Sequence, residues 1–325
     1  MNDIEKINFF IKILYHLIIL SEFFIFVAKK TGNFIDNIIT QNMKDIQPEI
    51  LKQSLGGAEI RYLQYPGDGP PLLLLHATGF NPWLWHPVSR SLTDNYRVMA
   101  PYFCDHRQAE PETGAVPWRL LAFDLYKLCE SLSLDRPYLA GHSMGATVIT
   151  IAQVTYGLAS KGMVLIEPIF LPEELYAVGL TLDTHPLASK SIKRRNAWAD
   201  ESEARAYLKS KSLFSKWDEE IIDLYVRHGM IAGPDGGLEL SCHPRREASL
   251  FLGSSRYNPW PLLSEVRCPA LVVEGETSQN REFINLPKIA SLIPDGSYHE
   301  VKGAGHLIPM EQPAEIARII KEFFK

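Results

Sequence analysis

Short apolar runs alternate with amphipathic stretches along the chain from about residue 58 onward. The run Leu72-Leu73-Leu74-Leu75 is continuous, as expected of a strand that is covered on both faces. Residues 118–131 instead have helical spacing, with Leu121, Leu125 and Leu128 on one stripe. This alternation predicts a mostly parallel, doubly wound α/β sheet. Strands are predicted at 58–64, 72–75, 97–100, 138–140, 163–166, 270–273 and 298–301, with helices at 118–131, 146–156 and 313–324.

The stretch between Glu167 and the strand at 270–273 breaks this alternation. It has helical character, for example at 201–210 and 218–228, and is too long for a loop inside a compact domain. The pattern therefore predicts a helical cap at 168–268, inserted between a first core segment at 58–167 and a second at 269–325. Aromatic residues of the cap (Trp198, Tyr207, Trp217, Tyr225 and Trp260) predict an apolar pocket between cap and sheet.

The first forty residues have a different pattern. Residues 9–28 are strongly apolar and about as long as a membrane span. Lys12, His16 and Glu22 interrupt this run, which favours a helix that lies in a membrane interface or packs on a partner. If the segment did span a bilayer, Lys29-Lys30 would keep the remaining domain on the cytoplasmic side. The alternatives are a helix docked on the protein's own surface and a start site assigned too early.

Composition and charge give no sign of a nucleic-acid partner, a disulfide framework or a metal site. The chain has 325 residues, 46% of them hydrophobic and 22% charged, which is typical of a folded globule. A net charge of −5 and the absence of a long basic run do not indicate a nucleic-acid partner. The four cysteines are scattered without a C-x-x-C pair, so no disulfide framework, metal site or cofactor is expected, and a cytoplasmic location is favoured. Oligomeric state is not indicated.

The segment Gly141-His142-Ser143-Met144-Gly145 carries the strongest chemical signal. It follows an apolar run and opens a helix-compatible stretch, which places Ser143 at the apex of a sharp strand-to-helix turn. Such a turn exposes the serine hydroxyl and directs helix N–H groups at any negative charge that forms there. Ser143 is therefore the predicted nucleophile.

A serine hydroxyl needs a base to remove its proton. Among the ten histidines, His306 is the predicted base, because the small residues of Gly303-Ala304-Gly305-His306 follow the last predicted strand and let a loop bring the imidazole to the carboxyl edge of the sheet. His142 also stands at a strand end but is expected to pack.

The base in turn needs an acid that fixes its tautomer. Glu167 follows the strand at 163–166, and a carboxylate there is costly to bury without a partner such as a histidine. Glu276 is the alternative acid, whereas Ser278 occupies a position where a carboxylate would be convenient. Oxyanion stabilisation is predicted from the backbone N–H groups of Met144 and Thr78, the latter in the loop after the 72–75 strand.

With these residues in place, the chain resembles the α/β-hydrolase superfamily over about residues 58–325. The resemblance rests on three segments in order: His76-Ala77-Thr78-Gly79 followed by Trp85, the Gly141–Gly145 segment, and Gly303-Ala304-Gly305-His306 with Glu311-Gln312-Pro313. It implies an eight-stranded, mostly parallel sheet with the cap inserted after the sixth strand.

Two segments depart from the pattern of that superfamily. Asp105-His106-Arg107 replaces a glycine-containing loop, and Ser278 stands where most members carry the acid. Certain haloalkane dehalogenases and lipases place the acid after the sixth strand, as Glu167 would be. Because the predicted nucleophile is serine rather than aspartate, dehalogenation and epoxide hydrolysis are not expected.

The predicted function is a serine hydrolase that cleaves a carboxylic ester, or a similar small hydrophobic acyl compound, through an acyl-enzyme. The same triad would also serve a C–C bond hydrolase or a perhydrolase. A ligand receptor that keeps the fold without catalysis, and a membrane-bound lipid hydrolase attached through residues 1–40, are the further alternatives.

Overall fold

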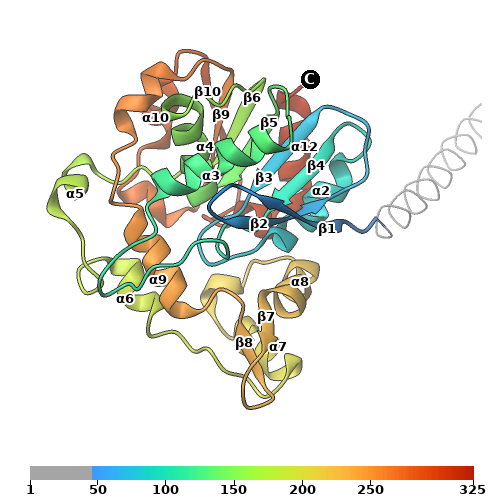
Figure 1. Cartoon of the computed structure of the whole chain (residues 1–325), viewed down its shortest axis with the longest axis vertical. Helices are drawn as coiled ribbons and strands as arrows, with labels where there is room; N and C mark the ends of the chain where they lie inside the picture. The colour runs from blue at the N-terminus through green and yellow to red at the C-terminus, as the bar shows by residue number, and fades with distance from the viewer. Residues whose placement is uncertain (1–45) are drawn as a thin grey trace, which may run out of the picture. The chain divides into compact units, whose positions relative to one another are not determined.

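An eight-stranded sheet of order β1-β2-β4-β3-β5-β6-β9-β10 organises the chain in a computed structural model that describes residues 46–325 (Figure 1). The strands from β4 to β10 are parallel, whereas β2 pairs antiparallel with both β1 and β4. The prediction of a mostly parallel, eight-stranded α/β sheet is confirmed. The strands are β1 (Glu49–Ser54), β2 (Glu59–Gln64), β3 (Pro71–Leu75), β4 (Arg97–Pro101), β5 (Tyr138–His142), β6 (Gly162–Ile166), β9 (Ala270–Gly275) and β10 (Gly296–Val301).

The apolar segment at residues 1–40 lies outside the described residues, so membrane attachment through it stays a prediction. Within residues 46–325, no helix combines enough length and apolar character to cross a bilayer.

Strand β1 was not among the strands predicted from the residue pattern. It lies at the edge of the sheet and none of its residues is buried; Ile50 is largely exposed. An edge strand with one neighbour buries too little to require alternating apolar residues. The pattern therefore gave little signal for it.

Helices cover both faces of the sheet (Figure 1). On one face α3 (Trp118–Ser131) packs against α4 (Met144–Thr155), and on the other α2 (His86–Leu92) packs against α12 (Pro313–Phe323). The bounds of α3 are those predicted, and α4 begins two residues earlier than predicted. The remaining core elements are η1 (Pro82–Trp85), η4 (Gln279–Glu282), α10 (Leu286–Leu292) and α11 (Ile308–Glu311).

The segment between β6 and β9 is mainly helical and gathers near one end of the sheet (Figure 1). It also contains an unpredicted two-stranded hairpin, whose turn includes Pro234-Asp235-Gly236-Gly237. The inserted elements are α5 (Glu173–Val178), α6 (Pro186–Ser191), α7 (Glu201–Lys209), η2 (Ser212–Phe214), α8 (Glu219–Gly229), β7 (Met230–Ala232), β8 (Leu238–Leu240), α9 (Pro244–Gly253) and η3 (Trp260–Glu265). We call this segment the cap.

The unusual segment Asp105-His106-Arg107 after β4 is tied to α3 through Asp124. Asp124 is buried and contacts both the His106 ring, at 2.9 Å, and the Arg107 guanidinium, at 2.7 and 2.9 Å. Burial acts to raise the pKa of Asp124, but the hydrogen bonds from Arg107 and His106 outweigh it, and the pKa lies below its ordinary value. An ion-paired network thus fixes this loop.

Helix α9 of the cap contacts the chain that enters α3. The N–H of Val116 donates to the Ser249 carbonyl at 3.1 Å, and the Trp118 indole donates to the Leu250 carbonyl at 2.8 Å. A Cβ on Gly253 would lie 1.8 Å from the Val116 carbonyl oxygen, which is backbone and cannot rotate away. The absence of a side chain at Gly253 therefore permits this contact.

We expect Gly253→Ala to lower the free energy of unfolding by about 1–3 kcal/mol, because the added methyl forces α9 away from Val116. Gly57→Ala is the matched control, since a Cβ there meets no atom within 4 Å. Urea denaturation of both variants measures the difference. Equal midpoints for the two variants would show that α9 does not need close contact with the core.

Candidate active site

Ser143 stands directly after β5 and before α4, in a strained backbone conformation with φ 53° and ψ −115°. Its N–H donates to the Ile166 carbonyl at 2.9 Å and so extends the ladder between β5 and β6 by one residue. A positive φ is costly for a residue with a side chain. The sharp turn predicted around Ser143 is thus present.

The two glycines beside Ser143 are required by close backbone approach. A Cβ on Gly141 would lie 2.6 Å from the Ala146 nitrogen, and one on Gly145 would lie 2.5 Å from the Leu75 carbonyl oxygen. The turn is therefore packed against both its own helix and the end of β3.

Glu167 follows β6 as Ser143 follows β5, and it too has a positive φ, of 48°. Its side chain is fully buried. Oε1 accepts the Gly275 N–H at 2.8 Å, and Oε2 accepts the Ser278 hydroxyl at 2.8 Å and lies 2.9 Å from His306 Nδ1. The structure thus brings together Glu167 and His306, which are 139 residues apart in the chain.

Glu276, the alternative acid, faces a different set of partners. Its carboxylate accepts the Gly303 N–H at 2.8 Å and pairs with Lys302 at 3.2 Å. The Gly303 N–H, assisted by Lys302, holds the pKa of Glu276 below its ordinary value. Among the hydrogen bonds and ion pairs of residues 46–325, Glu276 makes none with His306.

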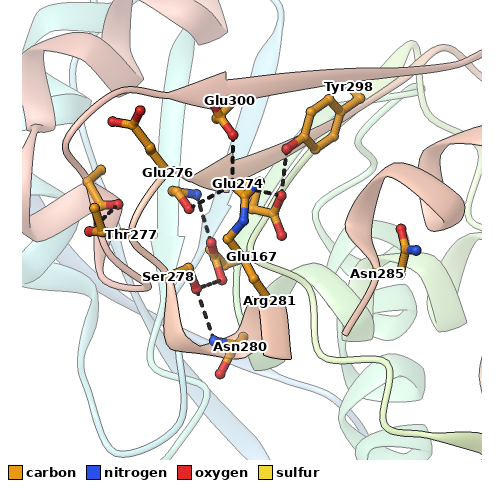
Figure 2. A network of polar contacts seen from close by, with 12 residues as sticks. Glu167, Glu274, Glu276, Thr277, Ser278, Asn280, Arg281, Asn285, Tyr298 and Glu300 are labelled. Carbon is orange, nitrogen blue, oxygen red and sulfur yellow. Dashed lines mark hydrogen bonds and ion pairs between the residues drawn. The ribbon is translucent and has the colours of Figure 1, made fainter. Parts of the chain in front are cut away.

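A second buried carboxyl group, Glu274, lies beside Glu167 at the end of β9 (Figure 2). The Tyr298 hydroxyl donates to it at 2.5 Å, and Arg281 lies 3.3 Å away. Burial raises the pKa of Glu274, and the nearby charge of Glu167 raises it further, whereas Tyr298 and Arg281 act against this. Arg281 also pairs with Glu300 and so compensates the acidic residues around Glu167.

His306 is carried by the glycine-rich loop that follows β10. Gly303 has a φ of 70°, and the Gly305 N–H donates to the Glu311 carboxylate at 2.7 Å. The side-chain amide of Asn280 also lies 2.9 Å from His306 Nδ1. Because Nδ1 has a single hydrogen-bonding position, a ring that donates its Nδ1 proton to Glu167 does not also accept from the Asn280 amide, and Asn280 then contacts the ring without a hydrogen bond to it.

His142 packs against this loop, as expected from its position beside Ser143. Its Nε2 lies 2.9 Å from the His306 carbonyl oxygen, and the two ring centroids are 5.1 Å apart. Burial, together with the charge of His306, lowers the pKa of His142 well below its ordinary value, so His142 stays neutral. This contact places the His306 loop next to Ser143. No hydrogen bond within residues 46–325 joins the Ser143 hydroxyl to His306, a bond that is often long before substrate binds.

Thr78 lies at the tip of a tight turn after β3. The Phe80 N–H donates to the Ala77 carbonyl at 3.3 Å, and Gly79 has a φ of 78°, as in a type II turn. Within the described part of the chain, neither the Thr78 N–H nor the Met144 N–H, the first of α4, donates to a protein acceptor. Both predicted oxyanion donors are therefore available.

A model of the alpha/beta hydrolase family matches residues 72–319. The chain belongs to the alpha/beta hydrolase family. A putative esterase/lipase from Haemophilus influenzae is 22% identical over 92% of this chain and 98% of its own length. A 2-(acetamidomethylene)succinate hydrolase from Mesorhizobium japonicum is 26% identical over 79% of this chain and 88% of its own.

A crystal structure of an E-2-(acetamidomethylene)succinate hydrolase superposes on this chain with a TM-score of 0.72 and 23% identity, covering 85% of this chain and 98% of the other. That likeness concerns the fold. The family and its named members indicate a hydrolase without fixing its substrate.

In this hydrolase the Thr78 turn is packed against the cap. A Cβ on Gly79 would lie 2.2 Å from Glu247 Oε1, so a side chain at position 79 would have to displace this carboxylate of α9. Glu247 is buried and pairs with Arg194 at 2.8 and 2.9 Å, and Arg194 extends to the Tyr225 hydroxyl at 3.4 Å. The charge of Glu247 thus has a partner inside the cap.

Aromatic side chains continue this contact. The ring of Phe80 packs edge-on against Trp217 at 5.5 Å and against Tyr225 at 5.8 Å. Trp217 and Tyr225, two of the aromatic cap residues on which the predicted apolar pocket depends, therefore contact the loop that carries Thr78.

Sequence reasoning missed several residues that build the site. Ser278 was noted only as a departure, yet its hydroxyl binds Glu167; Asn280, Arg194 and Glu247 were not singled out. Their roles depend on contacts between distant segments, which a single sequence does not reveal. The sequence offered one signal, a serine at the position convenient for an acid, next to a carboxylate on the neighbouring strand.

We expect Glu247→Gln to lower the free energy of unfolding by about 2 kcal/mol, because it leaves the largely buried Arg194 without its carboxylate. Asp223→Asn, which breaks an ion pair with Arg205 at the surface, is the control and should leave the urea midpoint unchanged. A loss as small as that of the control would mean that the Arg194–Glu247 pair contributes nothing to stability.

Proposed function

We propose that this hydrolase is a serine esterase that cleaves a carboxylic ester, or a similar small apolar acyl compound, through an acyl-enzyme. The observation that carries the proposal is the pairing of His306 with a fully buried Glu167, in a loop that contacts the residue before the strained Ser143. A histidine base held by an acid, in a loop next to a serine in a strained strand-to-helix turn, is the arrangement needed for nucleophilic attack on a carbonyl carbon.

In the proposed mechanism, Glu167 accepts the Nδ1 proton of His306 in a hydrogen bond, which leaves Nε2 free to accept the Ser143 proton. The Ser143 oxygen forms a bond to the carbonyl carbon, and the π electron pair of the C=O bond moves onto the carbonyl oxygen. The free N–H groups of Thr78 and Met144 stabilise this oxyanion. His306 then returns the proton to the leaving alcohol, and a water activated by the same imidazole releases the acid.

The aromatic residues of the cap favour a substrate with an apolar acyl or alcohol group. Phe80, Trp217 and Tyr225 form an aromatic cluster beside the Thr78 turn. Relatives named as a putative esterase/lipase and as a carboxylesterase are consistent with an ester substrate. A relative named 2-(acetamidomethylene)succinate hydrolase shows that the substrate panel should extend beyond simple esters.

Ser143→Ala should lower ester turnover by at least about 10⁴-fold, because no other group supplies the nucleophile. A fluorophosphonate probe should label the wild-type chain once, at Ser143, and should not label Ser143→Ala. Unchanged turnover of p-nitrophenyl acetate by the folded variant, or labelling at another residue, would refute the proposal. A β-diketone and 2-(acetamidomethylene)succinate, assayed in parallel, would identify C–C or other acyl specificity.

The acid is assigned by two matched glutamate variants. Glu167→Gln should reduce kcat by about 10⁴-fold, because an amide at this position favours the wrong imidazole tautomer. Glu276→Gln removes the same charge from a group that contacts Gly303 and Lys302, so its kcat should stay within about threefold of wild type. The reverse order of effects would make Glu276 the acid.

A further inference from the structure

The Thr78 side chain is buried, with 6% of its surface exposed, yet its hydroxyl has no hydrogen-bond partner within residues 46–325. A buried hydroxyl without a partner costs about 1–3 kcal/mol. Such a group in a folded protein calls for an explanation, for which a catalytic or binding role is one candidate.

The other buried threonines of the described chain do not share this feature. Thr93 donates to the Arg90 carbonyl at 3.0 Å, Thr147 to the Ile169 carbonyl at 2.9 Å and Thr150 to the Ala146 carbonyl at 3.2 Å. Each of these hydroxyls is satisfied by backbone nearby. Among the buried threonines of the described residues, Thr78 alone therefore has a hydroxyl without a partner; the Ser89 hydroxyl is the other unpaired buried hydroxyl.

The turn lies alongside the nucleophile. Leu75, the last residue of β3, pairs with Gly141 of β5, and the Leu75 carbonyl packs against Gly145. Thr78 follows three residues later, held in place by the Gly79 N–H, which donates to Cys104 Sγ at 3.3 Å, and by Glu247 above Gly79. The backbone N–H and the hydroxyl of Thr78 are thus two unpaired donors on one rigid residue beside the Ser143 turn.

We propose that the Thr78 hydroxyl is a third oxyanion donor, so that Thr78 contributes both its N–H and its Oγ1 proton to the negatively charged oxygen. This inference rests on the proposed function. The hydroxyl keeps its proton throughout and forms a hydrogen bond only. Because charge develops on the substrate oxygen in the transition state, this bond strengthens there and should act on kcat more than on KM.

The test compares Thr78→Val, which keeps the shape and the backbone N–H but removes the hydroxyl, with Thr78→Ser, which keeps the hydroxyl. Two rates are measured on the full chain: phosphonylation of Ser143 by a fluorophosphonate probe, and turnover of p-nitrophenyl acetate. Thr78→Val should slow both by about 100-fold with KM nearly unchanged. Thr78→Ser should stay within about threefold of wild type.

Stability separates a catalytic role from a structural one. Thr78→Val removes an unsatisfied group and should melt at the wild-type temperature or above it. Thr93→Val, which removes a satisfied hydroxyl far from the site, should melt lower with unchanged rates. If Thr78→Val does not fold, Thr78→Ala replaces it in the comparison with Thr78→Ser.

Three results would overturn the inference: equal rates for Thr78→Val and wild type, equal losses for the Val and Ser variants, or a loss confined to KM. Failure of the proposed esterase function gives a different result, because the probe would then never label Ser143 in the wild-type chain. Complete but slow labelling of Thr78→Val supports both the proposed function and the role of the Thr78 hydroxyl.

Discussion

The buried carboxylate of Glu167 is the interaction on which the site depends. Removing an ionised carboxyl group from water costs several kcal/mol unless donors replace the lost hydration. Here two segments supply three donors: the Gly275 N–H and the Ser278 hydroxyl at the end of β9 and just after it, and His306 Nδ1 in the loop after β10. Because the two segments are far apart in the chain, the bonds that compensate the charge also fix the position of the imidazole. A change in either segment should therefore shift His306.

The cap acts on the opposite side of the site, through the Thr78 turn. Glu247 of α9 lies over Gly79, and Arg194 compensates its charge within the cap. Phe80 packs against Trp217 and Tyr225, so the turn is bounded by cap side chains as well as by β3. The geometry of the donors at Thr78 is therefore set jointly by the sheet and by the insertion. Substitutions in the cap that shift α9 should alter the site without changing Ser143, Glu167 or His306.

The sheet and the site segments were predictable where local chemistry is strong. The apolar run at 72–75 and the Gly141–Gly145 segment specify a buried strand and a sharp turn regardless of their surroundings. Strand β1 was missed because an edge strand needs no apolar alternation, and the β7–β8 hairpin because three-residue strands leave no periodicity. Ser278 and Asn280 could not be assigned from sequence, since their roles arise from contacts with Glu167 and His306 that only the folded sheet brings about.

Backbone strain occurs at the carboxyl edge of the sheet in the two residues that directly follow the adjacent strands β5 and β6. Ser143 after β5 and Glu167 after β6 have positive φ values of 53° and 48°, and each still donates its N–H to the neighbouring strand, Ser143 to Ile166 and Glu167 to Val273. The ladder thus continues for one residue beyond each strand, after which the chain turns sharply. Each such conformation costs about 1–3 kcal/mol for a residue other than glycine and persists only where the surrounding structure over-determines it. At Ser143, the ladder hydrogen bond and the helix that begins at Met144 maintain the strained conformation. At Glu167, the donors around its carboxylate maintain it. Strain and burial are therefore parts of one arrangement, in which neither Ser143 nor Glu167 can relax without breaking the sheet edge that positions the other.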